Sequence, residues 1–191
     1  ASSNNKEELK KKIIELSLPL KKAVLQMEAE LQAADKSNDF ERYYDFVKGN
    51  VHFFVISSDV NEPAGISSAS TQAVWLQNAL ASSTSTFNIV YMHHSPYSSG
   101  LVHGSTTALQ WPYQTWGADI VLSAHDHLYE RLNVGGLPYI INGLGGYGIY
   151  SFSTPISGSL VRYNNTFGAM LVDVNQTTAN FSFINITGKV I

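Results

Sequence analysis

The sequence predicts an α/β domain that is preceded by an amphipathic helical segment. Two observations predict the α/β class. Short apolar runs of strand length alternate with helical patterns after residue 41, and two alternating runs near the C-terminus are typical of an antiparallel hairpin. A third observation sets residues 1–40 apart, because apolar residues recur there at helical spacing among many charges.

The overall composition limits the classes of protein to which the chain can belong. Of its 191 residues, 44% are apolar and 14% are charged, which is enough apolar material for one domain with a packed core. A formal charge of −3 provides no basic surface, so we expect no nucleic-acid partner. Cysteine is absent, which excludes a disulfide framework and a thiolate zinc site. No apolar run is long enough to span a bilayer, and we expect no membrane partner.

Charge is distributed unevenly along the chain. Residues 1–48 hold 9 of the 12 Lys and Arg residues and 9 of the 15 Asp and Glu residues, whereas every histidine lies in the charge-poor remainder. We therefore predict a boundary near residue 40, with a helical segment at 1–40 and a second domain at 41–191.

The segment 1–40 carries apolar residues at spacings of three and four, which places them on one face of a helix. Pro19 interrupts the pattern, so either a kink or two short helices would fit. We interpret the segment as a helix that covers apolar surface of its own chain or pairs with a second chain, including a second copy in a homo-oligomer. A membrane-surface or regulatory helix is the alternative. The apolar positions are Leu9, Ile13, Leu16, Leu20, Val24, Met27 and Leu31.

After Arg42 the pattern changes to short strands and turns, with one longer helix. The predicted elements are a hairpin of Tyr43–Val47 and Val51–Ile56, a helix over Ser68–Ser83, strands at Phe87–Met92, Ala118–Ser123 and Pro138–Asn142, a short helix over Thr107–Trp116, a glycine-rich loop at Gly143–Gly148, and strands at Ala169–Val174 and Asn180–Ile186.

Two groups of histidines follow predicted buried strands. His93 and His94 follow one apolar run, and His125 and His127 follow another. Ligands of open α/β sheets gather at the carboxyl ends of strands, so the two groups can converge on one point. Imidazole nitrogen suits zinc, iron and similar metals. The alternative is that these side chains only hydrogen-bond nearby loops, which five histidines within 35 residues disfavour.

Several stretches of residues 42–191 carry a family resemblance. They are Arg42-Tyr-Tyr-Asp-Phe-Val, Val51-His-Phe-Phe, Trp75-Leu-Gln-Asn-Ala-Leu, Val90-Tyr-Met-His-His-Ser-Pro-Tyr-Ser-Ser-Gly and His125-Asp-His-Leu-Tyr-Glu-Arg. In order and spacing they resemble the C-terminal half of the calcineurin-like metallophosphoesterases, in the purple acid phosphatase branch. The resemblance implies a partial sandwich, with a mixed sheet, flanking helices and a C-terminal antiparallel hairpin. It also implies a metal-dependent hydrolase that acts on a phosphate ester and binds phosphate ion, in a secreted or periplasmic protein.

The same resemblance implies roles for individual histidines. His93 and His125 would bind one metal ion and His127 the other. Of the pair His93-His94, the first is the better match to the ligand of the family, because it stands three residues before Pro96. His103 falls where the family places a histidine that contacts substrate phosphate or protonates the leaving group, so it is the catalytic candidate. The implied cofactor is a divalent or trivalent transition metal, namely zinc, iron or manganese.

The sequence departs from the family pattern in two ways. Ala124 replaces a usual glycine, which is a mild change if this position does not need a positive φ. The carboxylate and asparagine ligand motifs of the family (Asp-x-His/Gly, Gly-Asp and Gly-Asn-His-Asp/Glu) are missing, and the similar Gly49-Asn50-Val51-His52 is interpreted as a turn. Asp45, Asp59, Asp119, Asp126 and Glu130 occupy positions that are not ligands in the family.

Three functions therefore remain open from the sequence. The first is a phosphate-ester hydrolase domain that is incomplete without its carboxylate motifs. The second is an inactive remnant that binds one metal ion, a phosphate ion or neither. The third is an assembly module that pairs through its N-terminal helix. In each case we expect the isolated chain to have little or no phosphatase activity.

Overall fold

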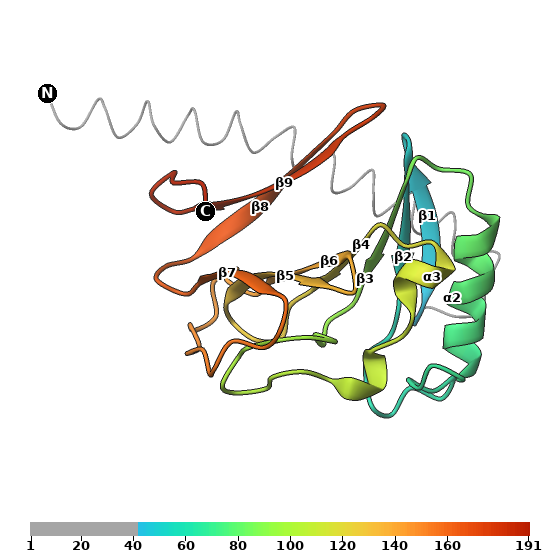
Figure 1. The fold of residues 1–191 in the computed structure, drawn as a ribbon, viewed down its shortest axis with the longest axis horizontal. Coiled ribbons are helices and arrows are strands. Elements are labelled where there is room, and N and C mark those ends of the chain that lie inside the picture. Colours follow the sequence, from blue (N-terminus) through green and yellow to red (C-terminus); the bar gives the residue numbers. More distant parts are fainter. Residues whose placement is uncertain (1–41) are drawn as a thin grey trace, which may run out of the picture. The chain divides into compact units, whose positions relative to one another are not determined.

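A mixed sheet of seven strands forms the centre of the described protein (Figure 1). The computed structural model describes residues 42–191. The strand order is β1-β2-β3-β4-β6-β5-β7, in which β2, β3, β4 and β6 pair in parallel and the remaining pairs are antiparallel. The strands are β1 (Tyr44–Lys48), β2 (Val51–Val55), β3 (Phe87–Tyr91), β4 (Ile120–Ser123), β5 (Tyr129–Val134), β6 (Leu137–Asn142) and β7 (Ser159–Tyr163).

The first two strands form the predicted hairpin. Lys48 pairs with Val51, and Gly49 in the turn between them has a φ of 62°. Glycine enters this left-handed region without a steric cost, which explains the tight connection. The stretch Gly49–His52 is therefore a turn that leads into a strand, as the sequence predicted.

One face of the sheet is covered by helices (Figure 1). The helix α2 (Thr71–Ser82) begins after Ser70, whose side chain accepts a hydrogen bond from the backbone N–H of Ala73 at 3.2 Å. Its Leu76 and Leu80 are buried against the sheet. This confirms the helix predicted over Ser68–Ser83.

The short helix predicted over Thr107–Trp116 is wrong as a single element. The structure divides it into a 3₁₀ turn, η1 (Thr107–Leu109), and a one-turn helix, α3 (Tyr113–Trp116). Pro112 lies between the two, and proline has no backbone N–H to continue a helical ladder.

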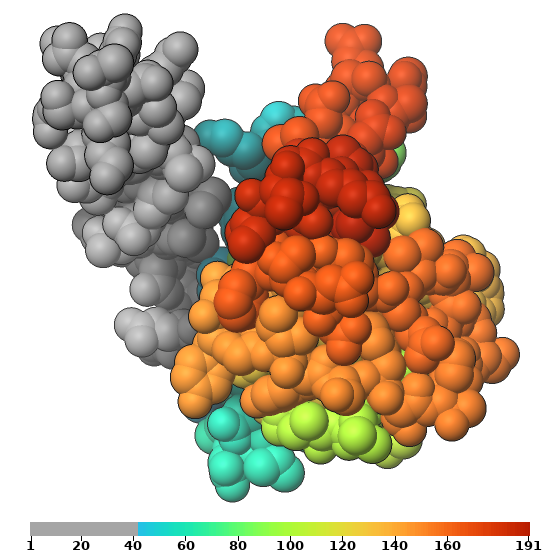
Figure 2. Space-filling view, turned by 90° about the vertical axis from the view of Figure 1, so that its left-hand side faces the viewer, coloured from blue at the N-terminus to red at the C-terminus, as the bar shows by residue number. Residues whose placement is uncertain are grey.

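The other face of the sheet carries a separate two-stranded sheet of β8 (Gly168–Val174) and β9 (Ala179–Asn185). Phe183 of β9 is fully buried and stacks on Tyr129 of β5 with ring centroids 4.4 Å apart. In Figure 2 the dark red C-terminal residues lie against the orange residues that include β7. The C-terminal antiparallel hairpin predicted from the alternating runs is confirmed.

The observed mixed sheet, flanking helices and hairpin confirm the predicted α/β class. The predictions for residues 1–40, including the amphipathic helix and its pairing with another chain, lie outside the described residues. Within residues 42–191, no helix combines the length and apolar character needed to cross a membrane.

Candidate functional site

The two histidine groups lie at the same edge of the sheet. β3 and β4 are neighbouring parallel strands, and His93 and His125 each follow the last residue of their strand by two positions. The backbone N–H of Ala124 donates to the carbonyl of His93 at 3.0 Å, which joins the two segments beyond the ends of the strands. The convergence expected from two strand-end groups is thus observed for His93 and His125.

Four imidazole rings form a cluster around His125. Its ring centroid lies 3.8 Å from that of His103, 4.2 Å from that of His94 and 4.8 Å from that of His93. The Nδ1 atom of His125 is 2.9 Å from the Nε2 atom of His93, a hydrogen-bonding distance between two imidazoles. The structure therefore brings His93, His103 and His125 together and adds His94, which the sequence analysis had not selected.

The backbone at His125 has an unusual conformation. Its φ is 63°, and the N–H of Asp126 donates to the carbonyl of Ala124 across it at 2.8 Å. A hydrogen bond of this span around a residue with positive φ marks a γ-turn, which is rare and strained. Such strain persists only where the surroundings hold it, and it often occurs at functional sites. Ala124 itself does not have a positive φ, so alanine is tolerated where the family usually has glycine.

Burial and neighbouring rings keep the central imidazole neutral. Burial lowers the pKa of His125 to about 4, and repulsion from His94, His103 and His93 adds to this effect. Burial also lowers the pKa of His94, with a further contribution from His93. A neutral imidazole has a free lone pair, which is the form that binds metal ions.

His127 is connected to this cluster through the ring of Tyr150, which both His127 and His103 contact. Its imidazole stacks on Tyr150 with centroids 4.1 Å apart and an interplanar angle of 13°, and His103 contacts the same tyrosine at 5.6 Å. The Nδ1 atom of His127 is buried and has no hydrogen-bond partner among the described residues. A buried ring nitrogen without a partner is available to a ligand: without a proton it can bind a metal ion, and with a proton it can donate to an anion.

The loop that carries His103 is fastened by Asp126. The carboxylate of Asp126, which is 1% exposed, accepts hydrogen bonds from the hydroxyl of Ser98 at 2.6 Å and from the backbone N–H groups of His103 and Gly104 at 3.1 and 3.0 Å. Asp126 is therefore engaged with this loop, although it stands between His125 and His127. The segment is turned rather than extended, and Glu130 fastens the same loop by accepting from the N–H of Ser99 at 2.8 Å.

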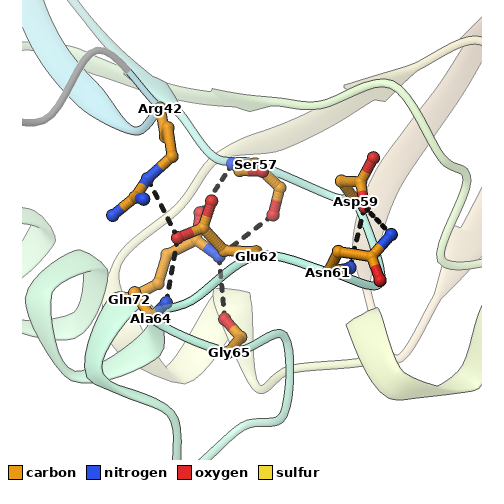
Figure 3. A network of polar contacts seen from close by, with 8 residues as sticks. All are labelled: Arg42, Ser57, Asp59, Asn61, Glu62, Ala64, Gly65 and Gln72. Carbon is orange, nitrogen blue, oxygen red and sulfur yellow. Dashed lines mark hydrogen bonds and ion pairs between the residues drawn. The ribbon is translucent and has the colours of Figure 1, made fainter.

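His94 is held by the loop that follows β2. The Nδ1 atom of His94 lies 2.8 Å from the hydroxyl of Ser58, which also accepts from the backbone N–H of His94 at 3.0 Å. Fully buried Gln72 of α2 fixes this loop, because its side chain bonds the N–H of Ser57 at 2.6 Å and the carbonyls of Ser57 and Gly65 at 3.0 Å each (Figure 3). The sequence signal that could have found His94 is only its place beside His93.

His52 is separate from the cluster. Its Nε2 atom lies 2.6 Å from a carboxylate oxygen of Asp45, and its Nδ1 atom lies 2.9 Å from the hydroxyl of Ser83. The same hydroxyl donates to the side-chain carbonyl of Asn88 at 2.6 Å. These bonds connect β1, β2, the end of α2 and β3, so His52 has a structural role.

The donor set suits one transition metal ion better than two. Two nitrogens that bind zinc tetrahedrally, each about 2.0–2.1 Å from the ion, lie roughly 3.3 Å apart, so His93 and His125 need to separate only slightly. Within residues 42–191, however, no three His, Asp or Glu side chains are already arranged to hold an ion. Imidazoles alone do not fit a centre of two ions, because such a centre uses carboxylates to offset the repulsion between them.

Comparisons with known proteins agree with this fold. The sequence model of a family described as calcineurin-like phosphoesterase matches residues 9–129, and this match begins upstream of the stretches on which the resemblance was based. The structure of purple acid phosphatase PPD1 from yellow lupin (Lupinus luteus) seeds superposes on 78% of this chain with a TM-score of 0.64 and 18% identity. GAP50, described as the anchor in the inner membrane complex of Plasmodium, superposes on 78% with a TM-score of 0.56 and 20% identity.

The similarity covers only part of these proteins. The chain spans 31% of the length of PPD1 and 51% of that of GAP50. At these identities the structural likeness establishes the fold, and the family match establishes the relationship that the histidine motifs predicted. No curated protein sequence matches the chain significantly.

Proposed function

Because the chain belongs to the calcineurin-like phosphoesterase family, we propose that its histidine cluster binds one transition metal ion and a phosphate-ester anion. The observation that carries this proposal is the group of close imidazoles around His125 at the carboxyl edge of the sheet. The lowered pKa of His125 supports it, since a neutral imidazole does not have to lose a proton before it binds a metal.

We assign the ion to His93 and His125, with His94 as a further ligand. Metal-binding histidines almost always use their second ring nitrogen in a hydrogen bond that fixes the orientation of the ring. His94 has this arrangement, because Ser58 engages its Nδ1 atom, while no described residue hydrogen-bonds its Nε2 atom. Zinc, iron and manganese all accept imidazole nitrogen, so any of them could bind here.

His127 and His103 are assigned to the anion. The Nδ1 atom of His127 is buried and has no hydrogen-bond partner among the described residues. Both His127 and His103 contact the ring of Tyr150. His103 is the catalytic candidate, because a histidine next to the bound phosphate could protonate the leaving oxygen. Asp126 holds the backbone of His103 in place for this contact.

We propose that turnover by the isolated chain is absent or very low. The metal would supply Lewis-acid polarisation of a phosphate oxygen. The motifs whose carboxylates support a pair of ions in this chemistry are missing from the sequence. Asp126 does not replace them, because its carboxylate is hydrogen-bonded to the loop that carries His103. Two metal ions together stabilise the attacking and leaving oxygens of a phosphoryl transition state, and this stabilisation is worth several kcal/mol. A single ion with few protein ligands does not provide it.

A phosphomonoester assay from acid to neutral pH, with zinc, iron or manganese added, tests this proposal. We expect activity near background in this assay. In a parallel calorimetric titration with inorganic phosphate, we expect binding that His103→Ala weakens. The matched control is His52→Ala, which removes a histidine that lies outside the cluster. Robust turnover that is abolished by His125→Asn would refute the low-activity proposal and show a working enzyme.

A non-enzymatic role is the second candidate. GAP50 has this fold and is described as an anchor, so the fold is compatible with an assembly function. The specific observation in its favour is that, within residues 42–191, no three His, Asp or Glu side chains are arranged to hold an ion, while His93 and His125 already bond to each other. A chain that binds neither metal nor phosphate in direct binding measurements would favour this role.

A further inference from the structure

Three carboxylates are buried among the described residues, and only one of them is paired with a cation. They are Glu62, Asp126 and Glu130. A carboxylate oxygen of Glu62 lies 3.2 Å from the guanidinium Nε of Arg42. In the part of the chain that the structure describes, Asp126 and Glu130 form no ion pair with a lysine or an arginine. Burying a charge without an opposite charge is costly, so these two carboxylates need a reason beyond packing.

The stretch of sequence that contains the histidine cluster has no permanent positive charge. Residues 49–130 hold all six histidines and no lysine or arginine. The acidic residues of the same stretch are Asp59, Glu62, Asp119, Asp126 and Glu130. Within this stretch, only a protonated imidazole or a bound cation can offset their negative charge.

Asp126 and Glu130 are enclosed by neutral groups. Asp126 is 1% exposed, and a Cβ atom on Gly100 would overlap its carboxylate, so the glycine lets the chain close over this charge. Glu130 is fully buried and accepts from the backbone N–H of Ser99 at 2.8 Å and from the hydroxyl of Ser159 at 2.6 Å. Such donors satisfy the carboxylate oxygens without cancelling their charge.

Both charges lie beside the histidine cluster. Asp126 directly follows His125 in the sequence, and its carboxylate accepts from the backbone N–H of His103, whose ring centroid is 3.8 Å from that of His125. Glu130 fastens the same loop through Ser99, four residues before His103. Solvent and salt screen buried charges weakly, so both carboxylates act on an ion that is bound at the cluster.

From this arrangement we infer that Asp126 and Glu130 set the charge preference of the histidine cluster, favouring a metal cation and opposing an anion. They act through the electric field and are not ligands of the ion. The inference rests on the proposed function, in which the cluster binds a metal ion and a phosphate ester. The alternative is a purely structural role, in which the two carboxylates only fasten the loop.

Two substitutions at Glu130 separate its charge from its hydrogen bonds. Glu130→Gln removes the charge but can keep both bonds, because the amide oxygen accepts from Ser99 and the NH₂ group donates to the hydroxyl of Ser159. Glu130→Asp keeps the charge, but its side chain is one methylene shorter and weakens the bonds. Asp119→Asn is the matched control, because it changes the net charge equally at the opposite end of β4 from His125.

Calorimetric titration of the full chain measures both affinities, first with zinc and then with inorganic phosphate on the zinc-saturated chain. We expect Glu130→Gln to weaken zinc binding by about tenfold and to strengthen phosphate binding by about threefold or more, since a buried charge acts on the two ions with opposite sign. Glu130→Asp and Asp119→Asn should stay within about threefold of the wild type for both ions. A loosened loop would weaken the binding of both ions together.

Affinities that Glu130→Gln leaves unchanged, or lowers together, would overturn the inference. Loss of zinc binding in Glu130→Asp but not in Glu130→Gln would also overturn it, because the hydrogen bonds and not the charge would then matter. The same holds if Asp119→Asn has the effect expected of Glu130→Gln, since net charge alone would explain it. A wild-type chain that binds no zinc or no phosphate would overturn the proposed function, and this inference with it.

Discussion

The Nδ1 atom of His125 lies 2.9 Å from the Nε2 atom of His93, although the two residues are 32 positions apart in the sequence. Parallel pairing of β3 with β4 brings the two segments to one edge, and the γ-turn at His125 aims its ring at His93. One of the two nitrogens must carry the proton that they share. A metal ion would replace that proton, so the pair is the natural centre of the proposed site.

The dependence of stability on pH tests the lowered pKa of His125. The folded value is about 4 and the ordinary value is 6.5, so between these pH values the unfolded chain binds a proton that the folded chain does not. The free energy of unfolding should therefore fall as pH decreases from 6.5 towards 4. His125→Asn should remove this part of the slope, and asparagine tolerates the left-handed backbone at this position. Urea titrations at several pH values measure it, and identical slopes in both proteins would contradict the account.

Gln72 provides a test of the loop that holds His94. Gln72→Leu keeps the volume of this fully buried side chain but leaves the N–H and carbonyl of Ser57 and the carbonyl of Gly65 without their partner. We expect a loss of about 2–4 kcal/mol in the free energy of unfolding, since buried polar groups without partners are costly. Gln77→Leu on the exposed side of the same helix is the matched control and should change stability by less than about 0.5 kcal/mol.

Asp126 provides a test of the loop that carries His103. The two carboxylate oxygens of Asp126 accept hydrogen bonds from the hydroxyl of Ser98 and from the N–H groups of His103 and Gly104. Asp126→Asn replaces one of these oxygens by an NH₂ group, which donates, so the side chain can no longer accept all three bonds. Hydrogen exchange at the amides of His103 and Gly104 should become about tenfold faster or more, because bonds to a charged group are worth about 1.5–3 kcal/mol. Asp173→Asn on exposed β8 is the control. Unchanged exchange in Asp126→Asn would show that other contacts hold the loop.

Elements with local sequence signals were predicted well, and those that depend on distant partners were not. α2 has a serine cap and apolar residues at helical spacing, so its range was evident from the sequence. β5 was missed because its sequence includes Glu130 and Arg131 and shows no simple alternation. Glu130 can be fully buried only because Ser99 and Ser159, both distant in sequence, donate hydrogen bonds to it.

The candidate site divides in the same way. His93 and His125 were predicted to converge because both follow buried strands, and the topology of the sheet alone brings such positions together. His94 could not be selected, because its partner Ser58 precedes it by 36 residues in a loop that Gln72 shapes. The direction in which each imidazole points depends on such tertiary bonds. The metal-binding roles that the resemblance implied for His93, His125 and His127 therefore stay predictions, and the proposed site keeps only the first two of them as metal ligands.

Metal analysis of the purified chain tests the central claim most directly. After equilibration with zinc, iron or manganese and dialysis, we predict one tightly held ion per chain and no second one; a chain that holds none would contradict the proposed site. His125→Asn should lose that ion, whereas His52→Asn, outside the cluster, should keep it. Two ions per chain at full occupancy, or one ion that His125→Asn leaves in place, would contradict the account.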